Sequence, residues 1–538
     1  AFDCCLKHFD QQRCFFNETG FDKIAYLCRN IRKSENLGAE NHIYLNYDSV
    51  EEFLPLVLLH DLTPVLADQK LVIAIGQDHK MEPERFSKVF GVTYNQADAK
   101  ELTLDEIQRM IFGWKITNAA GTSFLADIMD FHPNLLTIPD CLLTNFYPYY
   151  IKYLKDKTAV GAIRHLQSLP DQSEEKSVFY RITQVTDGHL TKEAYREATR
   201  VKPNQILEVL LEILPQTKIP TPREWISGIY LAYSKCHKRD LNTRVIPAVF
   251  MYPHDDMFYL AGVERVRVEF YLDLVCSYTD YKAIATIRDP VTHAGSVTRF
   301  MLESHPMAKD ANGNHQLDPF YCMAFGTFLP KDYLFANEHP LKEHISVIRF
   351  EDLKLNPEAT LESLTDFLDI PMCETMYQTT WCGQGHGGLT TAGVVLQGFD
   401  TKPLYSQHSK YLSIFDKYRI ESLMHDLMKQ YGYESIYYEQ ENFSPDQKYT
   451  LFEFPFRCEG IKNTMSAERR AQSREAGMKM IKLAITVSSM LEKGAVKVSG
   501  LPYTFSFLPW IHPKEELLRA PMYQTRRYPV SADGKTDG

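Results

Sequence analysis

A short glycine loop between a predicted strand and a predicted helix has the features of an anion site. Residues 111–117 (IFGWKIT) read as a strand, residues 118–122 (NAAGT) as a tight turn, and the helix begins at Thr122 or Ser123. The first turn of a helix offers free backbone N–H groups, and the two hydroxyls add further donors. No lysine follows Gly121, so the GxxxxGK[ST] pattern of Walker-type ATP or GTP hydrolysis is absent. A plain strand-to-helix turn remains the alternative for this loop taken alone.

The stretch IATIRDPVTHAGS supplies a second set of anion-binding groups. Arg288 stands at the end of a predicted strand over residues 282–289, and Ser296 follows eight residues later. Pro290 is a natural first-turn residue, so Ser296 should lie one to two turns into a helix. A guanidinium group binds a phosphate through two parallel hydrogen bonds. We therefore expect Arg288 and Ser296 to be able to share one phosphate.

A third stretch, ISVIRFEDLKLNPEATLESLTDFLDIP, reads as a packing unit. A strand over residues 344–350 leads into a charged loop, and a helix begins near Pro357 with its leucines on one face. Glu351 and Asp352 are interpreted as loop and capping residues, not as catalysts.

The segment at residues 381–393 (WCGQGHGGLTTAG) has four glycines within six residues. Glycine lets a backbone approach a phosphate closely, so Gly385 and Gly387 are candidate cofactor contacts and Lys402 could add charge. A flexible surface loop is the alternative. His386 could act as an acid or base, although a lone loop histidine is more commonly just solvated.

The elements that must position these groups alternate between strand and helix. Besides the strands above, residues 245–252 (VIPAVFMY) are a strand candidate, and residues 150–245 look mostly helical. Such alternation predicts an α/β fold with a parallel sheet. Residues 42–48 and 70–76 suggest a smaller α/β unit before it, and residues 466–494 form one long helix that could lie on a membrane or a partner but would more commonly pack on its own protein.

Composition limits the class of protein. The chain has 538 residues, and 59 basic minus 69 acidic residues leave a net charge of −10. At about 100–200 residues per domain, two to four domains are expected. Apolar residues at 44% and charged residues at 24% exclude a disordered chain, a collagen-like repeat and a small disulfide scaffold. The acidic balance argues against general nucleic-acid binding but leaves room for a local basic pocket.

The sequence also bears on compartment and metals. No apolar run reaches the ~18 residues of a membrane helix, and the first residues lack the apolar core of a signal peptide. Eleven cysteines without regular spacing fit a reducing compartment. We therefore expect a cytoplasmic protein, or a Golgi-lumen one if an anchor has been removed. The N-terminal cysteines lack C-x(2–4)-C spacing, so no metal site is predicted.

Together the motifs resemble a known family. GTSFLADIMDFHPNL, IRDPVTHAGS and IRFEDLKLNPEATLESLTDFLDIP, in that order, are similar to the three sequence blocks of sulfotransferases that use 3′-phosphoadenosine 5′-phosphosulfate (PAPS). The likeness covers about residues 108–435 and is closer to the bacterial, Golgi and tyrosylprotein branches than to the cytosolic small-molecule branch. It implies a P-loop-like parallel sheet flanked by helices, PAPS as donor and 3′-phosphoadenosine 5′-phosphate (PAP) as product.

The resemblance also implies residue roles. Asp140 falls where related enzymes keep a carboxylate base that accepts the proton of the acceptor hydroxyl. Arg288 and Ser296 match the pair that holds the 3′-phosphate. The loop that holds the 5′-phosphosulfate corresponds to Ala120, Gly121, Thr122 and Ser123.

One position departs from the family pattern. Ala119 stands two residues before the loop glycine, where the family usually has a lysine or arginine that stabilises the departing bridging oxygen. Losing one such electrostatic contact typically costs about 10²–10³ in rate. Lys115, His254 and His293 are the candidates to replace that cation.

We therefore expect a sulfotransferase acting on a hydroxyl of a glycan or hydroxylated metabolite; the alternative is a catalytically weakened binding or scaffold protein of the same fold. The expected organisation is an N-terminal α/β accessory region (1–105), a sulfotransferase-like domain (106–440) with a helical insertion (about 150–245), and a C-terminal extension (441–538). The terminal extensions are possible oligomerisation surfaces.

Overall fold

The computed structural model describes a defined part of the chain. The described residues are 102–114, 120–138, 146–183, 192–237, 248–251, 273–304, 318–328, 334–336, 342–389, 395–401, 404, 411–439, 443–461, 465–491, 496–497 and 504–520. Contacts divide the chain into two compact units, Ala1–Leu102 and Thr103–Gly538. The accessory region predicted over residues 1–105 lies almost entirely outside the described residues.

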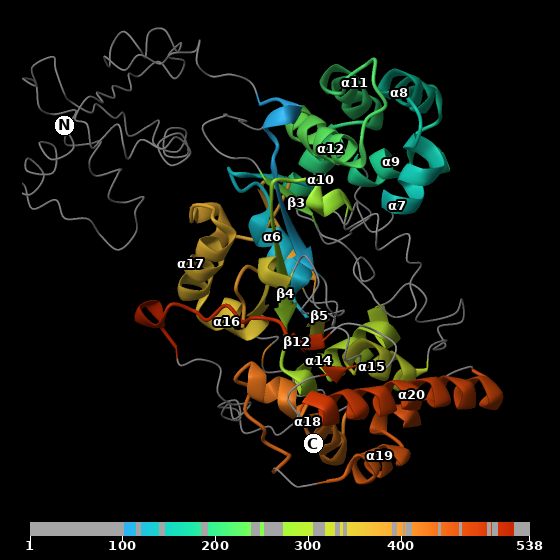
Figure 1. The fold of residues 1–538 in the computed structure, drawn as a ribbon, viewed down its shortest axis with the longest axis vertical. Coiled ribbons are helices and arrows are strands. Elements are labelled where there is room, and N and C mark those ends of the chain that lie inside the picture. The colour runs from blue at the N-terminus through green and yellow to red at the C-terminus, as the bar shows by residue number, and fades with distance from the viewer. Residues whose placement is uncertain are drawn as a thin grey trace, which may run out of the picture. The chain divides into compact units, whose positions relative to one another are not determined.

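A five-stranded parallel sheet forms the centre of the second unit (Figure 1). Its spatial order is β2 (Leu135–Thr137), β3 (Ala248–Met251), β1 (Arg109–Trp114), β4 (Asp280–Ile287) and β6 (Ile345–Arg349). These strands are short apolar runs, as expected when a sheet is covered on both faces. The predicted α/β fold with a parallel sheet flanked by helices is therefore confirmed; β2 is a strand that the sequence did not predict.

Three of these strands are each followed in the chain by a helix. β1 precedes α6 (Thr122–Met129), β4 precedes α14 (Pro290–Arg299), and β6 precedes α16 (Phe350–Leu355) and α17 (Pro357–Leu368). Ile111, Ile284 and Ile348 of the strands pack with apolar residues of α6 and α17 in one core. The prediction of a charged loop before Pro357 is wrong, because residues 350–355 form α16. The side chains of this helix are buried, except that of Leu355, which is half-buried.

A group of helices separates β2 from β3 in the chain. It comprises α7 (Phe146–Tyr149), α8 (Ala159–Ser168), α9 (Ser177–Thr183), α10 (Lys192–Arg200), α11 (Pro203–Ile213) and α12 (Pro222–Cys236). Thr221 caps α12 by accepting from the Glu224 N–H, while Glu224 accepts from the Thr221 N–H, which explains the sharp start of this helix. A Cβ atom on Gly228 would lie 2.9 Å from a methyl of Leu210, so α11 and α12 pack closely there.

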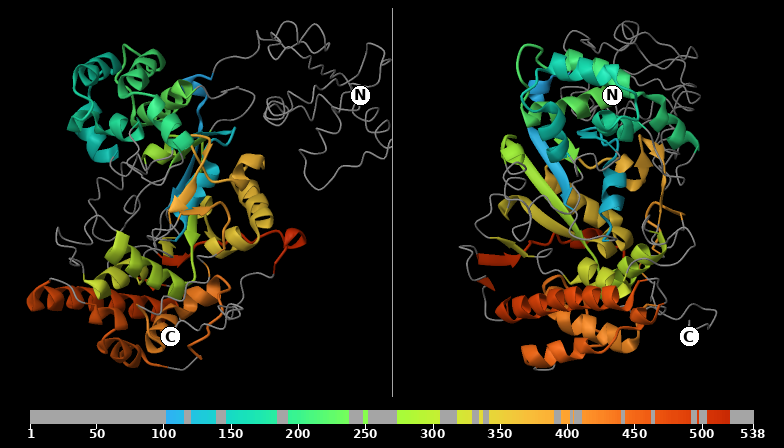
Figure 2. Two further views of the ribbon diagram at one scale, coloured as in Figure 1. Left: turned by 180° about the vertical axis from the view of Figure 1, so that it is seen from behind. Right: turned by 90° about the vertical axis from the view of Figure 1, so that its right-hand side faces the viewer.

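The C-terminal residues pack against the sheet domain. α20 (Ala467–Leu491) contacts α15 (Pro319–Thr327), α18 (Ile414–Gln430) and α19 (Pro445–Glu453), as Figure 2 shows along the lower edge. β12 (Thr504–Phe507) pairs with β5 (Leu334–Ala336), and the chain after it exchanges hydrogen bonds with Val347 of β6. The C-terminal segment therefore covers an otherwise open sheet edge. No helix among the described residues is long and apolar enough to cross a membrane.

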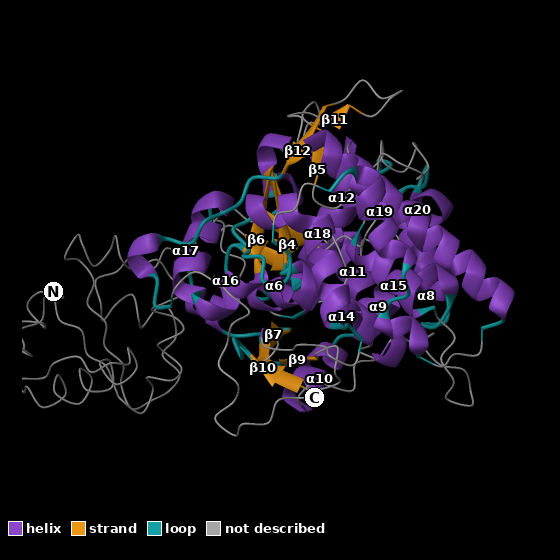
Figure 3. Ribbon diagram, turned by 90° about the horizontal axis from the view of Figure 1, so that it is seen from below, coloured by secondary structure: helices purple, strands orange, loops and turns teal. Residues whose placement is uncertain are grey.

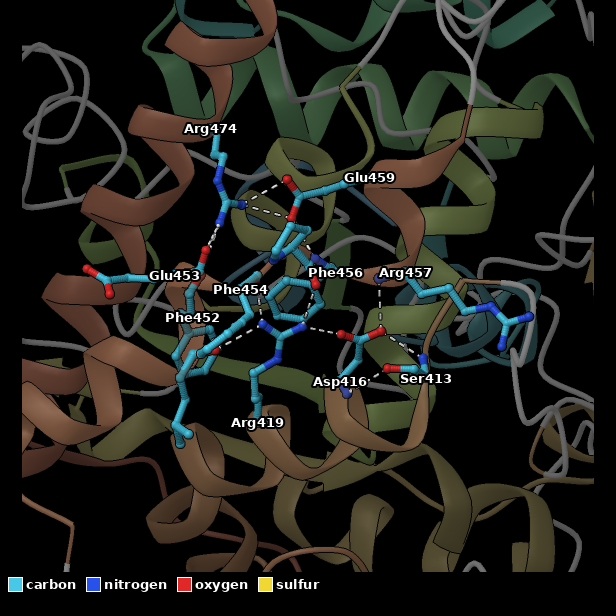
Figure 4. Close-up of polar contacts among 12 residues, drawn as sticks. Ser413, Asp416, Arg419, Phe452, Glu453, Phe454, Phe456, Arg457, Glu459 and Arg474 are labelled. Carbon is cyan, nitrogen blue, oxygen red and sulfur yellow. Dashed lines mark hydrogen bonds and ion pairs between the residues drawn. The ribbon is translucent and has the colours of Figure 1, made fainter.

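A buried ionic cluster joins α18, α19 and α20 (Figure 4). Arg419 of α18 is ion-paired with Asp416, and its guanidinium lies 3.7 Å from the Phe456 ring centroid. Arg474 of α20 donates to both carboxylate oxygens of Glu459 at 2.8 Å. Arg419 also donates to the carbonyl oxygens of Leu451, Phe454 and Pro455. We call these groups the C-terminal joint.

Candidate functional site

The turn into α6 requires a glycine. Gly121 has a φ of 103°, in the region that favours glycine, and it precedes the first helical residue. A Cβ atom at this position would collide with the ring of Phe350. The backbone therefore passes very close to α16, and the N–H groups of the first turn of α6 are placed at the carboxyl end of the sheet.

The two hydroxyls predicted at this turn have different surroundings. The Thr122 hydroxyl is buried and lies 2.8 Å from the hydroxyl of Thr286 on β4, so it also links the two strand-to-helix turns. Ser123 is exposed, and Ala120 is buried.

The turn from β4 into α14 carries the second predicted pair. Arg288 follows β4 directly and is 6% exposed, while Ser296 lies inside α14 and is 2% exposed. Asp289 caps the helix by accepting from the Thr292 N–H at 2.8 Å. The sequence thus correctly places Arg288 before the helix and Ser296 within it.

Phe350, the first residue of α16, is where these turns meet. The Arg288 guanidinium lies 5.1 Å from its ring centroid, and the Phe124 ring of α6 lies 6.0 Å away at a right angle. Gly121 also abuts this ring, so the segments that follow β1, β4 and β6 meet around Phe350. Ligands of open α/β folds bind at this edge of the sheet.

The glycine-rich segment forms two small hairpins, not one loop. β7 (Thr380–Trp381) pairs with β8 (Gln384–Gly385), and β9 (Gly387–Leu389) pairs with β10 (Val395–Gln397); β7, β9 and β10 lie apart from the main sheet in Figure 3. Gly385 is exposed, and Gly387 is buried in its hairpin. The expectation that His386 is solvated is wrong. Its side chain is buried, and its backbone N–H donates to the Thr379 carbonyl.

Asp130 attaches these hairpins to α6. This buried carboxylate follows the helix and accepts from the Gly383 N–H at 2.9 Å and the Thr380 hydroxyl at 3.0 Å. The glycine-rich segment is therefore anchored at the carboxyl end of α6.

Lys354 of α16 is a functional candidate that the sequence did not single out. It is 5% exposed, donates to the Gly398 carbonyl at 2.7 Å, and lies 3.5 Å from the Phe124 ring centroid. Phe399 packs edge-on against Phe124 at 5.2 Å. The only local signal is a lysine between two leucines, which does not distinguish a buried cation from a surface one.

Burial, together with a smaller effect of the positive charge of Arg288, lowers the pKa of Lys354 to about 7. Asp400 and Asp127 act in the opposite direction. A buried lysine with this pKa is poised between its charged and neutral forms near pH 7.

The buried carboxylates of α16 are structural. Glu351 accepts from the Asp289 N–H at 2.9 Å and from the Tyr433 hydroxyl at 2.8 Å, and burial followed by repulsion from Asp289 raises its pKa. Asp352 pairs with Arg349 at 3.0 Å. Burial raises the pKa of Asp352 to about 6, an effect that Arg349 partly offsets. These contacts agree with the interpretation that Glu351 and Asp352 are not catalysts, although they lie in a helix and not in a loop.

Of the remaining predicted residues, the structure describes only His293. His293 is buried in α14. No group of three or more potential metal ligands occurs in the described part of the chain. Lys115, Ala119, Asp140, His254 and Lys402 lie outside the described residues.

Comparison with known proteins places the second half of this site in a family. Residues 275–381, which include Arg288, Ser296 and Lys354, match the model of the sulfotransferase domain. The sulfotransferase domain from the curacin biosynthetic pathway is a structural match with 16% identity and a TM-score of 0.28, covering 56% of this chain and 87% of that one.

A second solved structure gives a similar result. The sulfotransferase domain from the Synechococcus PCC 7002 olefin synthase matches with 13% identity and a TM-score of 0.30, covering 56% of this chain and 88% of that one. No curated protein matches the sequence. The part of this chain that is similar to the sulfotransferase domain therefore contains β4, α14, β6 and α16, the elements that carry Arg288, Ser296 and Lys354.

Proposed function

We propose that the protein transfers a sulfuryl group from PAPS to a hydroxyl of a glycan or a hydroxylated metabolite. The observation that carries this proposal is the meeting of the Gly121 turn and Arg288 on Phe350, at the carboxyl ends of parallel strands. An anion-binding helix start and a buried arginine at one sheet edge suit a donor with two separate anionic groups.

The residues present fit such a donor. A Cβ at Gly121 would meet the Phe350 ring, so a glycine here lets the start of α6 lie against α16, whose Phe350 ring also lies beside Arg288. We assign the 5′-phosphosulfate to residues 120–123 and the 3′-phosphate to Arg288 and Ser296. Gly385, Gly387 and Lys402 would lie toward the nucleotide from the glycine-rich side.

The protein's contribution to the reaction is positioning and fixed charge. When bound, PAPS supplies the sulfuryl group, whose bond to the 5′-phosphate breaks as the acceptor oxygen bonds to sulfur. Asp140 is the proposed base for the acceptor proton, and Lys115 or His254 the proposed cation beside the departing oxygen. The helices α7 to α12, inserted between the two anion-binding turns in sequence, are the proposed acceptor-binding region.

Thermal denaturation with PAP or ATP tests the donor assignment. PAP should raise the Tm of the full chain, and ATP should raise it much less because it lacks the 3′-phosphate. Arg288→Ala should abolish the PAP effect while the protein still unfolds cooperatively. An unchanged Tm with PAP, or an unchanged PAP shift in Arg288→Ala, would contradict the assignment.

Catalysis requires a separate measurement, because Ala119 also suits a protein that binds PAPS without transferring sulfuryl groups. Labelled PAPS incubated with a mixed acceptor extract should yield a labelled product if the domain is active. Ala119→Lys should then raise the rate. PAP binding with no transfer to any acceptor, in both proteins, would favour the non-catalytic alternative.

A further inference from the structure

Lys354 has an unusual environment for a buried lysine. Its ammonium group lies close to three aromatic rings, those of Phe124, Phe350 and Phe399, at 3.5, 5.5 and 5.9 Å from their centroids. Its one hydrogen bond within the described residues goes to the Gly398 carbonyl. An ammonium group has three N–H donors, so two of them have no acceptor in the described part of the chain.

Charges of both signs lie near this lysine, and each of two carboxylates acts on it more strongly than Arg288 does. Phe124 is the third residue of α6, so Lys354 lies beside the helix start, which carries the positive end of the helix dipole. Arg288 is close enough to repel it. The charged groups that oppose this are Asp127 of α6 and Asp400, which follows Phe399. Neither carboxylate is hydrogen-bonded to Lys354.

Buried like charges are costly unless a counter-charge is bound. The Arg288 guanidinium and the Lys354 ammonium lie 5.1 and 5.5 Å from the centroid of the Phe350 ring, and Gly121 abuts the same ring. An anion at the start of α6 would therefore be near both cations and would offset their repulsion.

We propose that Lys354 is a binding residue of the anion site: it supplies a positive charge to the ligand held at the start of α6, while its bond to Gly398 holds the glycine-rich segment beside that ligand. This inference rests on the proposed function, since it takes PAPS or PAP as the anion. It assigns a cation to a site whose usual lysine or arginine is replaced by Ala119.

Proton uptake follows from this arrangement. Without ligand, the pKa of Lys354 is about 7, so at pH 8 most of the side chain is neutral. A bound anion raises that pKa, and the side chain takes up a proton on binding. The phosphates of PAP are already ionised at pH 8, because their second pKa is about 6. Affinity for PAP should therefore decrease as the pH rises above 7.

Isothermal titration of the full chain with PAP at pH 8, in two buffers of different ionisation enthalpy, measures this proton uptake. The wild type should take up a substantial fraction of one proton. Lys354→Met should take up none and bind PAP about tenfold more weakly. Lys354→Arg keeps the charge at every pH, so it should retain affinity and show no uptake.

Lys417→Met is the matched control. Lys417 of α18 is also buried, lies 5.3 Å from the centroid of the Tyr437 ring and donates to the Tyr437 hydroxyl at 3.5 Å. This variant should keep both the affinity and the proton uptake of the wild type. Thermal denaturation without ligand checks that each variant is folded.

The outcomes separate the two proposals. PAP binding to the wild type with the same affinity and proton uptake in Lys354→Met would overturn the role of Lys354 and leave the donor assignment intact. Failure of PAP to bind the wild type would contradict the donor assignment. In that case inorganic sulfate is titrated instead, and an equal Kd for the wild type and Lys354→Met would also overturn the role of Lys354.

Discussion

Two buried cations of this protein, Lys354 at the anion site and Arg419 in the C-terminal joint, have opposite surroundings. Arg419 is ion-paired with Asp416 and donates to three backbone carbonyls (Figure 4). Lys354 has one carbonyl partner, three aromatic rings and a neighbouring arginine. Burial lowers the pKa of both groups, but a guanidinium group remains charged at any pH the protein meets.

This difference suits a structural role for Arg419 and the proposed ligand-binding role for Lys354. Both terminal nitrogens of the Arg419 guanidinium donate to groups of the protein, so this residue can hold α18 to α19 and to the segment that follows α19 without a ligand. Among the described residues, Lys354 has an acceptor for only one of its three N–H groups, and burying the others unpaired costs free energy. A ligand that completes its partners explains why a cation is kept there.

The largest expected effect is on stability. Arg419→Met should lower the free energy of unfolding by about 3–5 kcal/mol, because it removes the ion pair of the buried Asp416 and leaves three backbone carbonyls without this donor. Lys354→Met should cost far less, since it removes a group that is poorly satisfied. Chemical denaturation of both variants without ligand measures the difference. Equal losses would show that Lys354 is as structural as Arg419.

A smaller loss is expected at the turn into α6. Gly121→Ala should destabilise the protein by about 1–3 kcal/mol, because alanine is strained at φ 103° and its Cβ meets Phe350. PAP binding should fall as well. Gly460→Ala is the control, because a Cβ at this glycine meets no atom within 4 Å. If both variants bind PAP like the wild type, the turn is not part of the anion site.

The dependence of stability on pH should distinguish the two cations. The folded-state pKa of Lys354 lies below its usual value, so between about pH 7 and 10 the unfolded chain binds the proton more tightly. Stability without ligand should therefore rise with pH through this window, by at most about 1.4 kcal/mol per unit. Lys354→Met should lose this contribution. Arg419→Met should retain it, which denaturation at several pH values can check.

The smallest effect concerns the support of the α14 turn. Tyr433→Phe removes one hydrogen bond to Glu351 and should cost about 0.5–1.5 kcal/mol, because Glu351 still accepts from the Asp289 N–H. PAP affinity should change little. A large loss of affinity would mean that Glu351 sets the position of Arg288 more directly than its contacts indicate.

Several parts of the site could be read from local patterns. The apolar runs of β1, β4 and β6 and the spaced leucines of α17 identify these elements, because burial on a sheet or on one helix face imposes its own period. The proline after Asp289 marks the start of α14 in the same way.

Other parts depended on residues distant in sequence. The segment 350–355 looks like a charged loop, yet its charges are buried because Arg349, Tyr433 and Asp289 supply partners for Glu351 and Asp352. No local pattern shows that β12 and its continuation reach β6.

By itself, therefore, the sequence determined the parallel α/β class, the order of the strand-to-helix turns and the residue types at them, because strand, turn and helix signals are local. Tertiary structure alone decided which charges are buried, that Lys354 stands beside α6 and Arg288, and that the C-terminal segment covers a sheet edge. Those outcomes depend on the summed environment of each side chain, and contacts between residues far apart in the chain create that environment.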